Sequence, residues 1–237
     1  MEIFDRIELK YLIPKEKYSS FIKDLAEYVS PDNYNGSNNK YNIFNIYYDT
    51  VDDLLIKKSM ANEDYTCKLR LRAYKESKSK DIIYIELKQK KLGVIHKSRS
   101  VIRLKEALDF LKTGDIYIQD YMNASVINEI SNLLNLHVVV PKAFISYKRN
   151  AYFSKNDESL RITFDTNIQS RRDNLVLEVD KKHLHKQLLN DNVMLMEIKT
   201  NNDIPFWLIK LLCKYRIHNI GYSKYGTEYK NNQMIKL

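Results

Sequence analysis

The stretch that most constrains the fold is residues 66–72, where cationic and apolar side chains alternate. Its sequence is Thr-Cys-Lys-Leu-Arg-Leu-Arg. In a β-strand this alternation places Lys68, Arg70 and Arg72 on one face and the apolar side chains on the other. Crowded cations repel one another unless an anion lies among them. The stretch therefore predicts a strand with one buried face and one face suited to an anion.

The same alternation of charged and apolar residues recurs in the next two predicted strands, 82–90 and 94–103. Glu86 and Lys88 share a face in the first, and Lys97 and Arg99 share one in the second. A sheet with its basic face in water is the simplest explanation of any one such strand. Solvent-facing strands usually mix charges of both signs, however, so the recurrence favours a cationic surface.

The rest of the chain alternates strand-like and helix-like periods. Strands are expected at residues 6–13, 43–49, 66–74, 82–90, 94–103, 138–150, 160–168, 174–180 and 193–200. Helices are expected after Pro14, over 52–60 with Asp52 as N-cap, over 105–112 and 125–136, and from about Pro205. We predict one α+β domain over 1–237, an eight-stranded antiparallel β-barrel with helices packed outside. The charged faces would then point inward and line a tunnel wide enough for a slim ligand.

Composition indicates the kind of binding partner and the cellular compartment. The 237 residues carry a formal net charge of +9, which favours an anionic partner such as phosphate, nucleic acid or a membrane surface. Cys67 and Cys213 are the only cysteines, so we expect a reducing compartment and no disulfide framework. No signal-like start and no run of ~18 apolar residues is present. A cytoplasmic protein without a transmembrane segment is expected.

Phosphates would have to be bound by side chains, because the sequence has five glycines and neither of the Gly-rich phosphate-binding motifs. Arg supplies a planar fork and Lys a point charge for this purpose. Carboxylates also occur on the basic faces: Glu8, Glu86, Asp165, Glu178 and Glu197. Each could simply pair with a neighbouring cation, but Mg²⁺ or Mn²⁺ bound with a triphosphate usually takes one or two carboxylates. Glu197 is our candidate for that metal ligand, and Cys67 is expected to be a packed thiol.

An ordered set of short motifs resembles a known family. They are residues 6–11 (Arg-Ile-Glu-Leu-Lys-Tyr), 47–50 (Tyr-Tyr-Asp-Thr), 68–72, 86–88 (Glu-Leu-Lys), 147–149 (Tyr-Lys-Arg), 197–199 (Glu-Ile-Lys) and 223–226 (Ser-Lys-Tyr-Gly). Together they resemble the VTC domain, the polyphosphate polymerase branch of the triphosphate tunnel metalloenzymes (CYTH-like superfamily). The resemblance covers essentially the whole chain.

The resemblance implies transfer of the ATP γ-phosphate to a growing polyphosphate with Mn²⁺ or Mg²⁺. It implies catalytic roles for Arg70, Arg72, Lys88, Arg149, Arg161, Lys199 and Lys224, substrate-binding roles for Lys10, Lys68, Lys97, Tyr147 and Ser223, and metal binding by Glu197. Its partners would be ATP, polyphosphate, pyrophosphate or triphosphate, and a membrane-protein partner stays open. The hydrolases and cyclases of the superfamily usually begin Glu-x-Glu-x-Lys, whereas Arg6 replaces the first Glu here, which favours the polymerase branch. The chain looks like a stand-alone bacterial version.

Two other functions fit the same residues. The first is a triphosphatase on the same fold, with water as the acceptor. The second is a non-catalytic module that binds polyphosphate or another polyanion. Few aromatic residues are interleaved with the basic strands for base stacking, so nucleic acid is not the expected partner.

Overall fold

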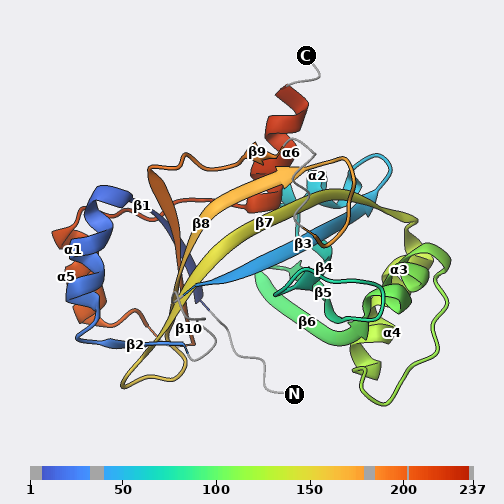
Figure 1. Cartoon of the computed structure of the whole chain (residues 1–237), viewed down its shortest axis with the longest axis horizontal. Coiled ribbons are helices and arrows are strands. Elements are labelled where there is room, and N and C mark those ends of the chain that lie inside the picture. Colours follow the sequence, from blue (N-terminus) through green and yellow to red (C-terminus); the bar gives the residue numbers. More distant parts are fainter. Residues whose placement is uncertain (1–6, 33–39, 179–184, 202, 235–237) are drawn as a thin grey trace. The chain divides into compact units, whose positions relative to one another are not determined.

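The structure is a computed structural model that describes all residues except 1–6, 33–39, 179–184, 202 and 235–237 (Figure 1). The helices are α1 (Lys15–Leu25), α2 (Leu54–Ala61), α3 (Leu104–Thr113), α4 (Ala124–Leu136), α5 (Phe206–Lys214) and α6 (Lys224–Met234). The strands are β1 (Ile7–Pro14), β2 (Val29–Pro31), β3 (Tyr41–Thr50), β4 (Tyr65–Ala73), β5 (Ile82–Lys91), β6 (Val94–Arg103), β7 (Val139–Ser154), β8 (Arg161–Arg171), β9 (Lys186–Gln187) and β10 (Val193–Thr200). None of the described helices is long and apolar enough to cross a bilayer.

The chain divides into two compact units, and β7 and β8 run through both. The first unit comprises residues 1–42, 147–168 and 187–223, and the second comprises 43–146, 169–186 and 224–237. Strand order is β1-β10-β8-β7 in the first unit, with β2 beside β7. In the second unit it is β7-β3-β4-β5-β6, and β9 pairs with β8. The expectation of a single domain stays a prediction.

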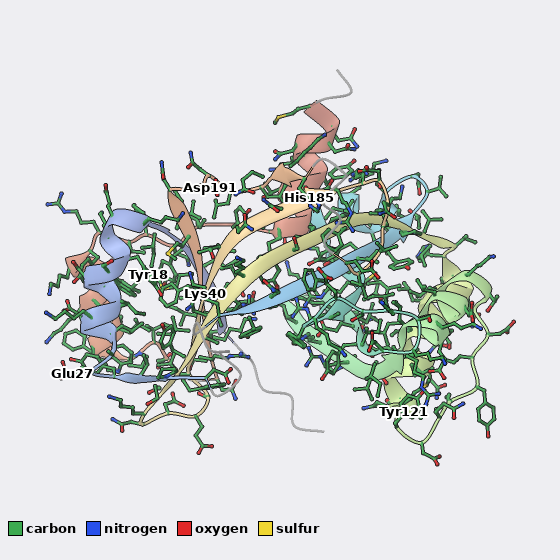
Figure 2. All side chains as sticks on the ribbon, in the orientation of Figure 1. Tyr18, Glu27, Lys40, Tyr121, His185 and Asp191 are labelled. Atoms are coloured by element: carbon green, nitrogen blue, oxygen red, sulfur yellow. The ribbon has the colours of Figure 1, made fainter. Side chains whose placement is uncertain are left out.

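In the first unit α1 and α5 cover the apolar face of the strands. The two helices also contact each other (Figure 1). Phe21 of α1 and Leu208 of α5 are fully buried against Phe164 of β8 and Ile198 of β10. Tyr18, labelled in Figure 2, packs edge-on against Phe164 with 5.2 Å between ring centroids. Because strand side chains alternate, the polar residues of β1, β8 and β10 lie on the opposite face.

In the second unit α3 and α4 cover the apolar face of β4, β5 and β6. Phe110 of α3 and Ile127 of α4 are fully buried, in one core with Leu69, Leu71 and other inward residues of the strands. Cys67 belongs to this core, and burial raises the pKa of its thiol to about 11. The predicted packed thiol is confirmed. The cations of β4, β5 and β6 lie on the other face, as their alternation predicts.

The predicted α+β class with an antiparallel sheet is confirmed, but the sheet is not closed as a barrel. The pairing path begins at β1 and ends at β6, and these two strands do not pair within the described residues. In the first unit the free edge of β1 is covered by another segment. Tyr11 bridges Asn219, and Ile220 N–H donates to the Lys10 carbonyl at 2.8 Å. In a closed barrel a neighbouring strand would form hydrogen bonds with this edge. Residues 219–220 form hydrogen bonds there instead.

The strand predicted at 174–180 is wrong for its described residues, 174–178, which form bends and irregular backbone. The buried Arg171 side chain explains this. Its guanidinium donates to the backbone carbonyls of Asn174, Val176 and Glu178, at 2.9–3.1 Å. These carbonyls therefore accept hydrogen bonds from a side chain instead of from a neighbouring strand. Asp180 lies outside the described residues.

The N-cap prediction for α2 is also wrong, because Asp52 does not cap the helix. The backbone N–H groups of the first three helical residues are bound instead by the side chains of Thr50 and Asp49, at 2.8–2.9 Å. Asp49 is fully buried, so these bonds replace the water it loses. The end of β3 therefore anchors the helix.

Candidate functional site

The polar face of the second unit carries two rows of side chains that cross adjacent strands. Pairing register places Tyr47, Arg70, Glu86 and Arg99 directly opposite one another in the first row. The second row, which we call the lysine row, is Lys68, Lys88 and Lys97. Like charges directly opposite one another destabilise a sheet. Three ammonium groups in register offer positive charge to a bound anion, and Lys97 among them also pairs with Glu86 at 3.0 Å.

Glu86 lies at the centre of what we call the cationic cluster: Arg70, Arg72, Glu86, Lys97 and Arg99. The carboxylate is 1% exposed. Its Oε2 accepts from Arg70 Nε at 2.7 Å, and its Oε1 accepts from Lys97 Nζ at 3.0 Å and Arg99 Nε at 2.8 Å. Arg72 Nε is 3.7 Å away. Four cations surround one carboxylate, so the cluster carries a net charge of +3.

This crowding changes the ionisation of the groups in the cluster. Burial alone would raise the pKa of Glu86, but the four cations outweigh it and hold that pKa far below its usual value. Burial, with repulsion from Arg70 and Arg72, lowers the pKa of Lys97 to about 7, although Glu86 opposes the shift. Glu86 is therefore ionised at any ordinary pH, whereas Lys97 changes charge near neutrality.

Tyrosines hold the arginines from the other side. Tyr47 Oη accepts from Arg70 NH1 at 2.9 Å, and Tyr74 Oη accepts from Arg99 NH2 at 2.6 Å. Burial would raise the pKa of the Tyr47 hydroxyl, but Arg70, Arg72 and the more distant Lys224 lower it. Lys224 is the first residue of α6. Its position near Tyr47 is fixed by Tyr225, whose ring stacks on Tyr47 at 4.6 Å.

The polar face of the first unit has a different charge balance. We call it the mixed cluster: Glu8, Lys10, Arg149, Asp165, Glu197 and Lys199. Arg149 donates to both oxygens of Asp165, at 2.6 and 2.7 Å, and to Glu197 Oε2 at 3.2 Å. Burial would lower the pKa of Arg149, but Asp165 outweighs it and raises that pKa. Three carboxylates balance three cations, and the Asp165 partnership confirms the simple pairing considered for that residue.

Lys199 joins the two glutamates of the mixed cluster. Its Nζ is 3.6 Å from Glu197 Oε2 and 3.9 Å from Glu8 Oε2. Lys10 Nζ is 3.5 Å from Glu8 Oε1 and donates to the Tyr222 carbonyl at 2.8 Å. The two glutamates thus lie on one face around one ammonium group.

The oxygen donors of the mixed cluster fit part of a metal site. Glu197 is opposite Thr163 in the β10–β8 register, and Thr163 Oγ1 is buried without a hydrogen-bond partner. No group of three or more His, Cys, Asp or Glu among the described residues could by itself hold a metal. Mg²⁺ and Mn²⁺ bound with phosphates need only one or two protein carboxylates. Glu197, with Glu8 nearby, meets this need.

The remaining predicted residues of the first unit lie around the mixed cluster. Arg161 is opposite Lys199 in register, and its NH2 donates to Asp32 at 2.9 Å. The Tyr147 ring lies under the Arg149 guanidinium, 5.3 Å from it. Ser223 is half-buried at the end of the unit. Apart from Ser223 at the end of the first unit and Lys224 at the start of α6, the predicted site residues therefore fall into two sets, one on the polar face of the strands in each unit.

Sequence reasoning missed two contributors. Arg99 shares its face with Lys97 in the alternating pattern, yet it was not among the predicted site residues. Glu86 was read as a simple ion-pair partner, whereas one carboxylate contacts four cations. The register between β4, β5 and β6 is what brings these groups together, and the sequence signal for it was the repeated alternation.

Comparison with known families decides the relationship. The model of the VTC domain family matches residues 5–232. The chain belongs to the VTC domain family. A search of curated protein sequences finds no relative of it.

Two solved structures share the fold. One is a putative adenylate cyclase from Bacillus halodurans, with 15% identity and a TM-score of 0.56, covering 92% of this VTC domain and 95% of that chain. The other is a putative adenylyl cyclase from Hippeastrum, described as having a dominant triphosphatase activity, with 14% identity and a TM-score of 0.56. That match covers 95% of this chain and 96% of the other. At these identities the likeness concerns the fold alone.

Proposed function

We propose that this VTC domain is a polyphosphate polymerase that transfers the γ-phosphate of ATP to the end of a polyphosphate chain. The observation that carries the proposal is the cationic cluster beside the lysine row. A net charge of +3 around one buried carboxylate, with Lys68 and Lys88 in register beside its Lys97, suits a ligand with several adjacent negative charges. A chain of phosphates has that character.

The chemistry asks for charge stabilisation more than for acid–base groups. The terminal oxyanion of polyphosphate attacks the γ-phosphorus, a new P–O bond forms, and the bond to the β-phosphate oxygen breaks. ADP leaves with the electron pair of that bond. Because the attacking oxygen is already ionised, no general base has to activate it, and the protein mainly positions phosphates and stabilises spreading charge.

The roles follow from the residues available on each face. We assign the transferring phosphates to Arg70, Arg72 and Lys88. Further phosphate ligands are Arg149, Arg161, Lys199 and Lys224, with Lys10, Lys68, Lys97, Tyr147 and Ser223 binding the remainder of the substrate. Glu197, supported by Glu8, would hold Mn²⁺ or Mg²⁺, which would neutralise phosphate charge.

The test is incubation of the purified domain with ATP and Mn²⁺, with products separated by length. A ladder of polyphosphate with an equal amount of ADP is the expected result. Free phosphate without a ladder would instead identify a triphosphatase. Binding of polyphosphate without ATP turnover would identify a non-catalytic polyanion-binding module.

A further inference from the structure

Glu86 is a negative charge at the centre of a face proposed to bind an anion. A carboxylate there repels phosphate, so its presence needs a reason. Register places it between Arg70 on β4 and Arg99 on β6, directly opposite both. Each of its oxygens bonds toward a different neighbouring strand: Oε2 toward β4 and Oε1 toward β6. One side chain therefore orients cations from two strands.

The contacts orient the guanidinium groups in a specific way. Arg70 presents Nε and NH2 to Glu86, each 2.7 Å from Oε2, and NH1 to Tyr47. Arg99 presents Nε to Glu86 and NH2 to Tyr74. The Arg99 guanidinium also stacks on the Tyr84 ring at 4.0 Å. These side chains have long flexible stems, and fixing them in advance reduces the entropy lost on binding a phosphate.

Lys97 is the member of the cluster that depends most on Glu86 for its charge. Its Nζ is 3.0 Å from Oε1, and its side chain remains 43% exposed, so a ligand can reach it. Among the described residues of β4, β5 and β6, the other charged side chains on this face are cations: Lys68, Arg70 and Arg72 on β4, Lys88 and Lys90 on β5, and Arg99 and Arg103 on β6. The neutral hydroxyls of Tyr47 and Tyr74 complete the surroundings. Glu86 is the negative charge that the structure places against this ammonium group.

We propose that Glu86 is a positioning residue, which keeps Lys97 charged and holds Arg70 and Arg99 ready to bind the phosphate chain. The inference rests on the proposed function, because it presumes that this face binds phosphate. Without Glu86 the cluster would gain net positive charge, yet Lys97 would lose its proton at a lower pH. Just below neutral pH, where wild-type Lys97 still carries its proton, a phosphate ligand would then meet a neutral amine. The lowered pKa of Lys97, near 7, supports this account.

The experiment measures inorganic triphosphate binding by calorimetry between pH 5 and 9, without ATP and without metal. For the wild type we expect the affinity to fall by about tenfold as Lys97 deprotonates, because one charge-assisted contact is lost. In Glu86→Gln, the midpoint of this fall should move to lower pH by at least about one unit, the size of shift that a close opposite charge produces. The midpoint is the decisive readout, since removing a negative charge would by itself raise affinity for an anion.

Three variants separate this role from a purely structural one. Lys97→Gln reports the titration of the ligand itself, and Lys97→Arg should bind without the fall because its charge persists. Glu106→Gln, a partly exposed glutamate paired with Arg103, is the matched control and should keep the wild-type midpoint. If Glu86→Gln does not fold, the pair Glu86→Gln with Arg99→Gln restores the cluster charge to +3 and serves instead.

The outcomes are distinct. The inference would be supported if the midpoint is lower in Glu86→Gln than in the wild type and Lys97→Arg shows no fall in affinity over the same pH range. An unchanged midpoint, or an equal loss of affinity at every pH, would overturn it while leaving the proposed phosphate site intact. Failure of the folded wild-type domain to bind triphosphate would overturn both the inference and the proposed function.

Discussion

The polar faces of the two units are built in the same way but differ in their charge balance. Each lies on one side of alternating strands whose other, apolar side is covered by helices. In the cationic cluster four cations share Glu86, whereas in the mixed cluster three cations share three carboxylates. Strand alternation thus sets where charges go, and the choice of residue at each position sets what they bind. Excess positive charge suits a phosphate chain, and balanced charge that includes several carboxylates suits a metal bound with phosphates.

The largest effect should come from Arg70→Ala. This change removes three contacts of the guanidinium, two to Glu86 and one to Tyr47, and leaves the carboxylate facing the remaining cations. We expect ATP turnover to fall about 100- to 1,000-fold, the usual cost of removing one positioned stabiliser of developing charge. Lys75→Ala removes an exposed cation paired with Asp81 and should remain near wild type. Near-normal turnover of Arg70→Ala would contradict the assignment of the cationic cluster.

A smaller and different effect is expected from Glu197→Gln in the mixed cluster. Turnover should fall, and the Mn²⁺ concentration needed for half-maximal activity should rise by about tenfold or more. Metal-free triphosphate binding should persist, because the cationic cluster is untouched. Activity measured against Mn²⁺ concentration, together with metal-free calorimetry, checks both statements. Equal losses in the two measurements would mean that Glu197 supports the phosphate site instead of a metal.

The lysine row offers a third comparison. Lys68→Gln removes one of the three ammonium groups that pairing register brings together, and with it part of the positive charge offered to a phosphate chain. Triphosphate affinity should fall by about tenfold. Lys199→Gln in the mixed cluster should instead lower stability, because Glu197 and Glu8 lose a shared partner. Calorimetry measures the first effect and denaturant unfolding the second, and unchanged triphosphate affinity in Lys68→Gln would contradict the role of the lysine row.

The smallest effect is expected from Tyr47→Phe. The change removes the hydroxyl that accepts from Arg70 NH1 but keeps the ring that stacks on Tyr225. One hydrogen bond to a charged group is lost, while Glu86 still holds the other side of the guanidinium. Turnover should fall by no more than about tenfold. A loss as large as that of Arg70→Ala would show that the tyrosine itself acts on the substrate.

Much of this architecture could be predicted from local patterns. The alternation over 66–72, 82–90 and 94–103 gave both the strands and the face on which the cations lie. Local patterns could not predict features that depend on tertiary contacts outside the segment itself. Residues 174–178 have strand-like composition, yet the Arg171 side chain binds their carbonyls. The sequence predicts no helix after the one from about Pro205, whereas Lys224–Met234 forms α6, in which Tyr225 is buried and stacks on Tyr47.

The candidate site was predictable in its membership more than in its arrangement. The resemblance to the VTC domain pointed to residues on both faces, and the family match supports that relationship. Neither pattern nor motif showed that one glutamate would bridge cations on two strands, because that depends on pairing register. Barrel closure also failed as a prediction, since residues 219–220 cover the β1 edge. Pairing of strand edges is decided by segments far away in the sequence.

The most direct test of the account follows one labelled phosphate. The domain is incubated with Mn²⁺, unlabelled polyphosphate and ATP labelled at the γ-phosphate, and the label is located after separation by length. We predict that it appears in polyphosphate, in an amount equal to the ADP formed, and that Arg70→Ala abolishes the transfer. Label found only in free phosphate, or transfer unchanged in Arg70→Ala, would contradict the account.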